Sequence, residues 1–175
     1  MRAARIAVLA CAWLAACAQL QTAGEQSLFE LNGRIAARYG EESFSGNVAW
    51  RHAERADEML LSTPLGQGVA RIVREGEAVQ LTTANGREYR APDAESLTER
   101  ALGFRLPLEG MADWVRGEPA AGTPATKETY PDGKLRVLHQ HDWRIEYLEY
   151  DGARPRLLQL DYPGVRLRFA ISEWR

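Results

Sequence analysis

The 175-residue sequence has little cysteine and no excess of basic charge. Its two cysteines are too few for a disulfide-stapled scaffold. With 22 basic residues against 24 acidic ones, the chain lacks the positive charge that nucleic-acid binding requires, so no nucleic-acid partner is expected. Intrinsic disorder is excluded as well, because 45% of the residues are hydrophobic and can bury a core. The length is that of one ordinary domain.

Motifs of the common enzyme classes are also missing. The sequence contains no GxSxG, no Walker loop, no HExxH and no dinucleotide fingerprint. The turn Gly66-Gln67-Gly68 has no phosphate-binding pattern of its own. Glu146 and Glu149 lie near Arg144 on strand-like segments, which is typical of a solvated surface rather than an acid–base pair. We therefore expect no enzyme and no catalytic residue.

Histidine is scarce, and two of the three histidines are close in sequence. His139 and His141 would project from the same face of a strand, and two imidazoles can share a metal if a carboxylate such as Asp142 joins them. His52 is the third histidine. The favoured interpretation of the segment from His139 to Asp142 is a polar hairpin tip, and no metal is expected.

The longest apolar run near the start has only 11 residues, from Ile6 to Ala16. A membrane-spanning helix needs about 20. A basic start, a short apolar run and small residues at its end are typical of an export signal. Leu14-Ala15-Ala16-Cys17 further resembles the bacterial lipobox, which implies cleavage before a lipidated cysteine. The alternative is an ordinary signal peptide with a cysteine near its cleavage site.

These features predict a signal peptide at residues 1–16 and a lipidated tether at residues 17–27. Cys17 would carry S-linked diacylglycerol and an N-linked acyl chain, and no other cofactor is expected. Cys11 would be removed, which excludes thiol catalysis and a cysteine metal site in the mature chain. Loss of Arg2 and Arg5 from the 22 basic residues leaves 20 against 24 acidic ones. Ala18, where an aspartate would favour retention at the inner membrane, implies the periplasmic face of the outer membrane as the destination.

Residues 28–175 are expected to form a single domain that is mainly β with a small helical insert. Alternating apolar and polar residues predict antiparallel strands, with Phe29, Leu31 and Ile35 on the dry face of the first. The expected strands are Leu28–Tyr39, Phe44–Trp50, Glu58–Thr63, Gly68–Arg74, Ala78–Thr83, Arg87–Ala91, Leu135–Gln140, Trp143–Tyr150, Arg156–Asp161 and Val165–Trp174. Many short strands joined by turns indicate an antiparallel barrel or sandwich.

Two helices are predicted in the middle of the chain. Asp93 can cap the first, which ends near Leu102, and Pro107 stands in the first turn of the second, which ends at Gly117. Residues 117–127 are expected to be a loop. A large sheet face with few large residues in the insert to cover it hints at a cavity.

The segment Ser62–Gly68 places a large apolar side chain at the tip of a loop. Pro64 and Gly66 favour a turn around Leu65. Single exposed leucines are common, and Leu65 could also fold back onto the sheet, so contact with a membrane is one of two interpretations.

Several segments, taken in order, resemble the LolB family of outer-membrane lipoprotein receptors. They span nearly the whole expected mature chain and follow a lipobox: Leu31–Ile35, Phe44–Trp50, Leu60–Gly66, Leu106–Leu108, Trp114–Gly117, Leu167–Ile171 and Trp174. The stretch before Leu28 is shorter than in some members, so an initial helix found there is expected to be missing.

This resemblance implies an eleven-stranded, half-open antiparallel β-barrel with a helical lid over a hydrophobic cavity. It implies a monomeric receptor that takes the acyl chains of lipoproteins from the periplasmic carrier LolA and inserts them into outer-membrane lipids. It also places Leu65, with Pro64 and Gly66, in a membrane-insertion loop. A passive, lipocalin-like lipid-binding lipoprotein is the main alternative, and a structural lipoprotein with a filled core is another.

The inner faces of the strands and of the second helix are then expected to line the cavity, although the same residues could pack a solid core. These candidates are Phe29, Leu31, Ile35, Phe44, Val48, Trp50, Leu61, Met111, Trp114, Trp143, Ile145, Leu167 and Phe169.

Overall fold

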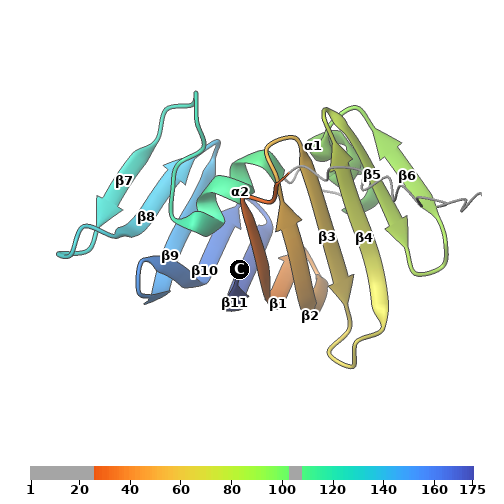
Figure 1. Ribbon diagram of the computed structural model, residues 1–175, viewed down its shortest axis with the longest axis horizontal. Coiled ribbons are helices and arrows are strands. Elements are labelled where there is room, and N and C mark those ends of the chain that lie inside the picture. Colours follow the sequence, from red (N-terminus) through yellow and green to blue (C-terminus); the bar gives the residue numbers. More distant parts are fainter. Residues whose placement is uncertain (1–25, 103–107) are drawn as a thin grey trace, which may run out of the picture.

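A computed structural model describes residues 26–102 and 108–175. Within these residues the chain forms eleven strands and two helices, with six strands before the helices and five after them (Figure 1). In chain order they are β1 Phe29–Tyr39, β2 Glu42–His52, β3 Ala56–Ser62, β4 Gly68–Glu75, β5 Ala78–Thr83, β6 Glu88–Ala91, α1 Ala94–Leu102, α2 Leu108–Arg116, β7 Thr126–Thr129, β8 Leu135–Gln140, β9 Trp143–Asp151, β10 Arg154–Tyr162 and β11 Val165–Trp174.

All strands belong to one antiparallel sheet in the order β6-β5-β4-β3-β2-β1-β11-β10-β9-β8-β7. The first and last strands of the described residues pair along most of their length and together form the centre of the sheet. β6 and β7 stand at opposite ends of this order and do not pair with each other, which leaves the curved sheet open. The expected fold, a half-open antiparallel barrel with a helical insert, is confirmed.

The central strands approach each other closely at two glycines. A Cβ on Gly33 would stand 2.4 Å from the carbonyl oxygen of Ala170, where the register of β1 and β11 shifts. A Cβ on Gly46 would stand 2.1 Å from the carbonyl oxygen of Ser62. Only glycine fits such positions without movement of the neighbouring backbone.

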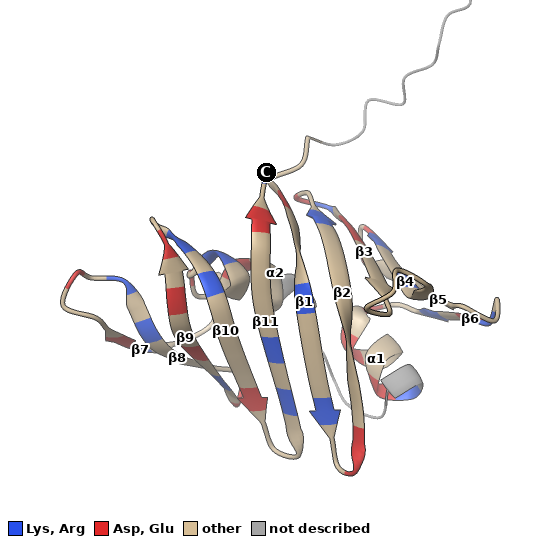
Figure 2. Ribbon diagram, turned by 90° about the horizontal axis from the view of Figure 1, so that it is seen from below, with Lys and Arg blue, Asp and Glu red and all other residues tan. Residues whose placement is uncertain are grey.

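Both helices lie on one side of the sheet, behind β11, β1 and β2 in the view of Figure 2. Asp93 caps α1 as predicted, because its carboxylate accepts a 2.6 Å hydrogen bond from the Ser96 backbone N–H. The helix α2 ends at Gly117, whose positive φ of 84° lets its N–H reach the Trp114 carbonyl at 3.0 Å. The Glu118 N–H completes this Schellman cap on the Asp113 carbonyl. Pro107 lies outside the described residues.

The strand β7 is the one element that the sequence does not predict. It consists of four exposed residues with no apolar alternation, and it begins within the segment 117–127 that is expected to be a loop. Pairing with β8 alone defines this strand. A short edge strand with no buried face has no periodic signal, because it contributes hydrogen bonds and not core.

Candidate functional site

The residues predicted to line a cavity all come to the helix-covered face of the sheet. Eleven of these thirteen lie on strands and two, Met111 and Trp114, on α2. All are buried except Phe44 and Leu61, which are partly buried against the same hydrophobic cluster. Aromatic contacts tie the cluster together, with ring centroids 5.3 Å apart for Phe29 and Trp50 and 6.0 Å apart for Trp114 and Trp143. The structure thus brings the thirteen predicted residues together, whereas their contact with acyl chains stays a prediction.

An open cleft of about 880 Å³ leads from solvent to this cluster. Its lining shares Val79, Ala94 and Leu108 with the hydrophobic core. The rest of the wall comes from five separate segments: Arg74 and Glu77; Pro92, Asp93, Glu95 and Ser96; Gly110 and Asp113; Ala120, Ala121 and Thr123; and His141. None of the thirteen residues predicted to line a cavity is in this wall. The sequence does not predict this wall, because no periodic pattern connects the short segments that form it.

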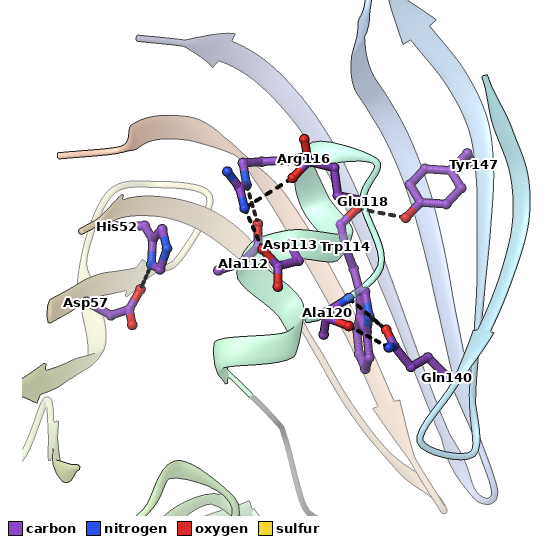
Figure 3. Close-up of polar contacts among 10 residues, drawn as sticks. All are labelled: His52, Asp57, Ala112, Asp113, Trp114, Arg116, Glu118, Ala120, Gln140 and Tyr147. Carbon is purple, nitrogen blue, oxygen red and sulfur yellow. Dashed lines mark hydrogen bonds and ion pairs between the residues drawn. The ribbon is translucent and has the colours of Figure 1, made fainter. Parts of the chain in front are cut away.

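The helix α2 is fastened to the sheet by buried Gln140 on β8 (Figure 3). The Gln140 side-chain oxygen accepts hydrogen bonds from the Trp114 indole N–H and the Ala120 backbone N–H, each at 2.8 Å. Its amide nitrogen donates to the Ala120 carbonyl at 2.8 Å and the Thr123 carbonyl at 3.0 Å. One side chain therefore holds both α2 and the loop that follows it.

A second fastening comes from Tyr147 on β9. Its hydroxyl donates a 2.9 Å hydrogen bond to the Trp114 carbonyl, beneath the end of α2. Burial raises the pKa of Tyr147 far above its ordinary value, so the hydroxyl keeps its proton and remains a donor at any physiological pH.

A buried ionic network crosses β2, β3 and β4. The Asp57 carboxylate accepts hydrogen bonds from the Trp50 indole at 2.8 Å, from His52 Nδ1 at 2.7 Å and from Arg74 Nε at 2.5 Å. Burial by itself raises the pKa of Asp57. The hydrogen bonds from His52, Arg74 and Trp50 lower the pKa by more, so that it lies below its ordinary value. The network fixes the indole of Trp50, one of the predicted cavity residues.

The loop between β3 and β4 presents Leu65 to solvent. The Leu65 residue is 91% exposed. The loop holds its shape through the Thr63 N–H, which donates to the Gln67 carbonyl, and the Gly66 N–H, which donates to the Thr63 carbonyl, each at 2.8 Å. Gly66 has a φ of 86°, a value that favours glycine. Leu65 therefore stands at the tip and does not fold back onto the sheet. Its contact with a membrane stays a prediction.

The histidines near the end of β8 do not form a cluster. His139 is exposed on the strand, while His141 and Asp142 have φ values of 51° and 63° in the two-residue turn to β9. This geometry is the polar hairpin tip expected from the sequence. Across residues 26–102 and 108–175, no three His, Cys, Asp or Glu side chains gather closely enough to hold a metal. Glu146 forms a 2.8 Å ion pair with Arg144.

The predicted signal peptide, Cys17 and most of the tether lie outside the described residues. Neither helix of the described part is long and apolar enough to cross a membrane.

Comparisons with known proteins identify the family of this chain. A family model described as outer membrane lipoprotein LolB matches residues 27–174. The outer-membrane lipoprotein LolB of Nitrosomonas europaea is 38% identical over 153 residues, which cover 84% of this chain and 72% of the relative. That of Azoarcus sp. strain BH72 is 34% identical over an alignment of 190 residues, covering 99% of this chain and 98% of the relative.

Solved structures show the same fold at low sequence identity. A LolA superfamily protein of Nitrosomonas europaea has a TM-score of 0.54 at 9% identity, covering 87% of this chain and 86% of that one. A putative outer membrane lipoprotein-sorting protein domain of Vibrio parahaemolyticus also has a TM-score of 0.54, over 84% of each chain. The sequence matches carry the family assignment: this chain belongs to the LolB family of outer-membrane lipoproteins.

Proposed function

We propose that this protein is an outer-membrane receptor that accepts acylated lipoproteins from a periplasmic carrier of the LolA type and inserts them into the membrane. The observation that carries the proposal is Leu65, which is almost fully exposed at the tip of a loop in a member of this family. A water-exposed leucine held at a loop tip suits contact with lipid better than contact with water.

The need for such a receptor follows from the hydrophobic effect. Three acyl chains contain on the order of 45 methylenes, and exposing each to water costs about 0.8 kcal/mol. A lipoprotein therefore cannot cross an aqueous compartment by itself. Transfer between two protein interiors keeps the chains out of water at each step and needs no nucleotide.

The 880 Å³ cleft is the proposed entrance for the acyl chains. It has the volume of a pocket that holds a drug-sized ligand, and its Val79, Ala94 and Leu108 continue into the apolar core. Because Gln140 and Tyr147 hold α2 to the sheet, we propose that the chains enter between α2 and α1 rather than by lifting α2. On the other side of this proposed entrance, α1 contacts the short strands β5 and β6 at one edge of the sheet.

Cys17 and Leu65 have different proposed roles at the membrane. Burying one leucine side chain gains about 2 kcal/mol, which cannot anchor a protein. The acyl chains on Cys17 hold the protein at the bilayer, since several chains give stable attachment where one does not. Leu65 then inserts into the lipid beside the bound lipoprotein, so that release takes place at the bilayer.

Depletion of the protein from its own cell, followed by membrane fractionation, tests this function. We expect other outer-membrane lipoproteins to accumulate in the periplasm or inner membrane after depletion, and re-expression of the parent chain to restore them. Normal lipoprotein distribution after complete depletion would contradict the proposal. A passive lipid-binding lipoprotein would give that normal result and would also fail to crosslink to the carrier.

A further inference from the structure

The outer face of the two central strands carries a group of arginines, which we name the basic face. It consists of Arg34 and Arg38 from β1 and Arg166 and Arg168 from β11. All four are exposed and alternate along β1 and β11 with buried residues such as Ile35 and Leu167, so they project from the face opposite the helices. That face of the two strands is turned toward the viewer in Figure 2. Arg38 stands directly opposite Arg166 in the register, and Arg168 stands opposite Ala36.

The charge of the basic face is poorly balanced by the protein itself. Asp161 pairs with Arg166, with 2.6 Å between carboxylate oxygen and Nε. Within residues 26–102 and 108–175, Arg34, Arg38 and Arg168 form no ion pair or hydrogen bond through their side chains. Like charges directly opposite each other destabilise a sheet, and Asp161 offsets part of the repulsion between Arg38 and Arg166. An external anion would pair with the three arginines that Asp161 does not bind.

The other end of the same outer face is electrically paired. Arg51 on β2 forms a 2.8 Å ion pair with Glu30 on β1. Arg175 pairs with Glu173, which also accepts a 3.0 Å hydrogen bond from Asn32. The unbalanced charge is therefore confined to one half of the two strands, which distinguishes it from an ordinary mixed surface.

A groove of about 450 Å³ runs through the basic face. Arg38, Arg166 and Arg168 line it, and the small side chains of Ala36, Ser43 and Ser45 leave space between the guanidinium groups. Guanidinium groups bind phosphate oxygens through paired, charge-assisted hydrogen bonds, and serine hydroxyls can add further donors. The groove thus has the shape and chemistry to take phosphodiester groups.

The basic face and the Leu65 loop are turned to the same side of the molecule. The β3–β4 loop is the lowest part of the described chain in Figure 1, and Figure 2, which is seen from below, looks onto the face of β1 and β11 that is turned away from the helices. A bilayer that meets the exposed leucine therefore also faces the four arginines. An apolar tip combined with nearby basic residues is the pairing expected where protein meets an anionic lipid surface.

We propose that the basic face is a docking surface for the anionic phospholipid headgroups of the membrane that Leu65 contacts. This inference rests on the proposed function, and it adds which side of the sheet faces the lipid and what charge the lipid carries. The eleven residues between Cys17 and Phe29 span up to about 40 Å when extended, so an anchor at Cys17 permits this orientation.

The test uses the full acylated protein reconstituted into vesicles of phosphatidylcholine with or without phosphatidylglycerol. A fluorophore on Ala170→Cys, on the outer face next to Arg34, reports docking through quenching by headgroup-labelled lipid. We expect strong quenching in phosphatidylglycerol vesicles, weak quenching in phosphatidylcholine alone, and loss of the difference at high salt. For Arg34→Gln/Arg38→Gln/Arg168→Gln, the ratio of docked to undocked protein should fall on the order of a hundredfold, because each arginine near an anionic surface contributes a factor of about five.

The matched control removes the same charge elsewhere, in Arg87→Gln/Arg90→Gln/Arg136→Gln, whose three exposed arginines lie toward the edges of the sheet. This variant should dock like the parent. Equal quenching in the two kinds of vesicle, or equal loss in both triple variants, would overturn the docking surface.

Two further outcomes separate this inference from the proposed function. If the basic-face variant docks normally but no longer crosslinks to the carrier, the surface binds an acidic protein and the lipid proposal is wrong. Lipoprotein transfer is measured in the same vesicles. Intact docking without any transfer by the parent would refute the receptor function alone, while transfer without charge-dependent docking would refute the docking surface alone.

Discussion

The indole N–H of Trp114 on α2 donates a 2.8 Å hydrogen bond to the buried side-chain oxygen of Gln140 on β8. The same glutamine also satisfies backbone groups of Ala120 and Thr123. Together with Tyr147, this side chain fixes the position of α2, and it also fixes part of the wall of the cleft.

Replacing Gln140 by leucine should destabilise the protein by about 3 kcal/mol or more, because each buried polar group left without a partner costs about 1–3 kcal/mol. Urea unfolding measures the change. Gln140→Glu is the matched variant: it keeps the acceptor for Trp114 and, when protonated, donates to one of the two carbonyls, so we expect an intermediate loss that grows as the carboxyl ionises. A Gln140→Leu variant as stable as the parent would show that the clamp contributes nothing.

Gly46→Ala should cost about 1–3 kcal/mol, because the added Cβ would stand 2.1 Å from the Ser62 carbonyl oxygen and force β2 and β3 apart. Gly68→Ala is the control, since a Cβ there meets nothing within 4 Å. That substitution should be neutral or stabilise by up to about 1 kcal/mol. Thermal unfolding of the two variants distinguishes them, and equal stability would contradict the close approach.

The network around Asp57 should make stability depend on acid pH. Its folded-state pKa is lower than the ordinary value of 3.8, so the ionised carboxylate contributes stability that is fully present above that value. The contribution is lost as the pH falls from about 5 through the folded-state pKa, because the unfolded chain then binds the proton more readily. Unfolding free energies measured across this range should decline on the acid side.

Asp57→Asn checks that assignment. The substitution should lower stability at neutral pH by about 3–5 kcal/mol, since it leaves Arg74 buried without its anionic partner. It should also flatten the acid decline. Glu58→Gln, which removes an exposed carboxylate on the same strand, should change neither property by more than about 0.5 kcal/mol. An unchanged acid decline in Asp57→Asn would assign the pH dependence to other carboxylates.

Leu65→Glu should leave folding and acceptance from the carrier nearly intact while impairing release into membranes. The side chain is exposed, so its replacement should alter stability by no more than about 0.5 kcal/mol. Carrier-to-receptor and receptor-to-vesicle transfer are measured separately. Leu148→Glu, at a leucine that is 39% exposed on β9, is the control and should release normally. Normal release by Leu65→Glu would refute the membrane-contact role.

Cys17 should be the first residue of the mature protein and should carry diacylglycerol and an amide-linked acyl chain. Mass spectrometry of protein purified from membranes tests both points. Cys17→Ser should leave the chain unacylated, whereas Cys11→Ser, in the predicted signal peptide, should change nothing in the mature product. An unmodified Cys17, or cleavage at another position, would contradict the lipid anchor.

The sequence by itself predicted the strands, the helix ends and, from the lipobox, the lipidation of Cys17. Strict alternation in Phe29–Tyr39 and Val165–Trp174 placed these strands and their buried faces, because a one-sided sheet repeats every two residues. Asp93 and Gly117 marked helix ends through capping chemistry. Pro64 and Gly66 predicted the turn around Leu65, whereas only the structure decided that its side chain is exposed.

Only the tertiary structure decided which distant residues meet. Pairing of β1 with β11 brings Arg38 opposite Arg166, and packing of α2 on the sheet brings Trp114 to Gln140. The cleft wall likewise joins segments far apart in the chain, and the edge strand β7 is defined only by its pairing with β8. Periodicity and capping report interactions within a few residues, whereas these contacts arise from the register of strands and the seating of a helix, which no short stretch of sequence encodes.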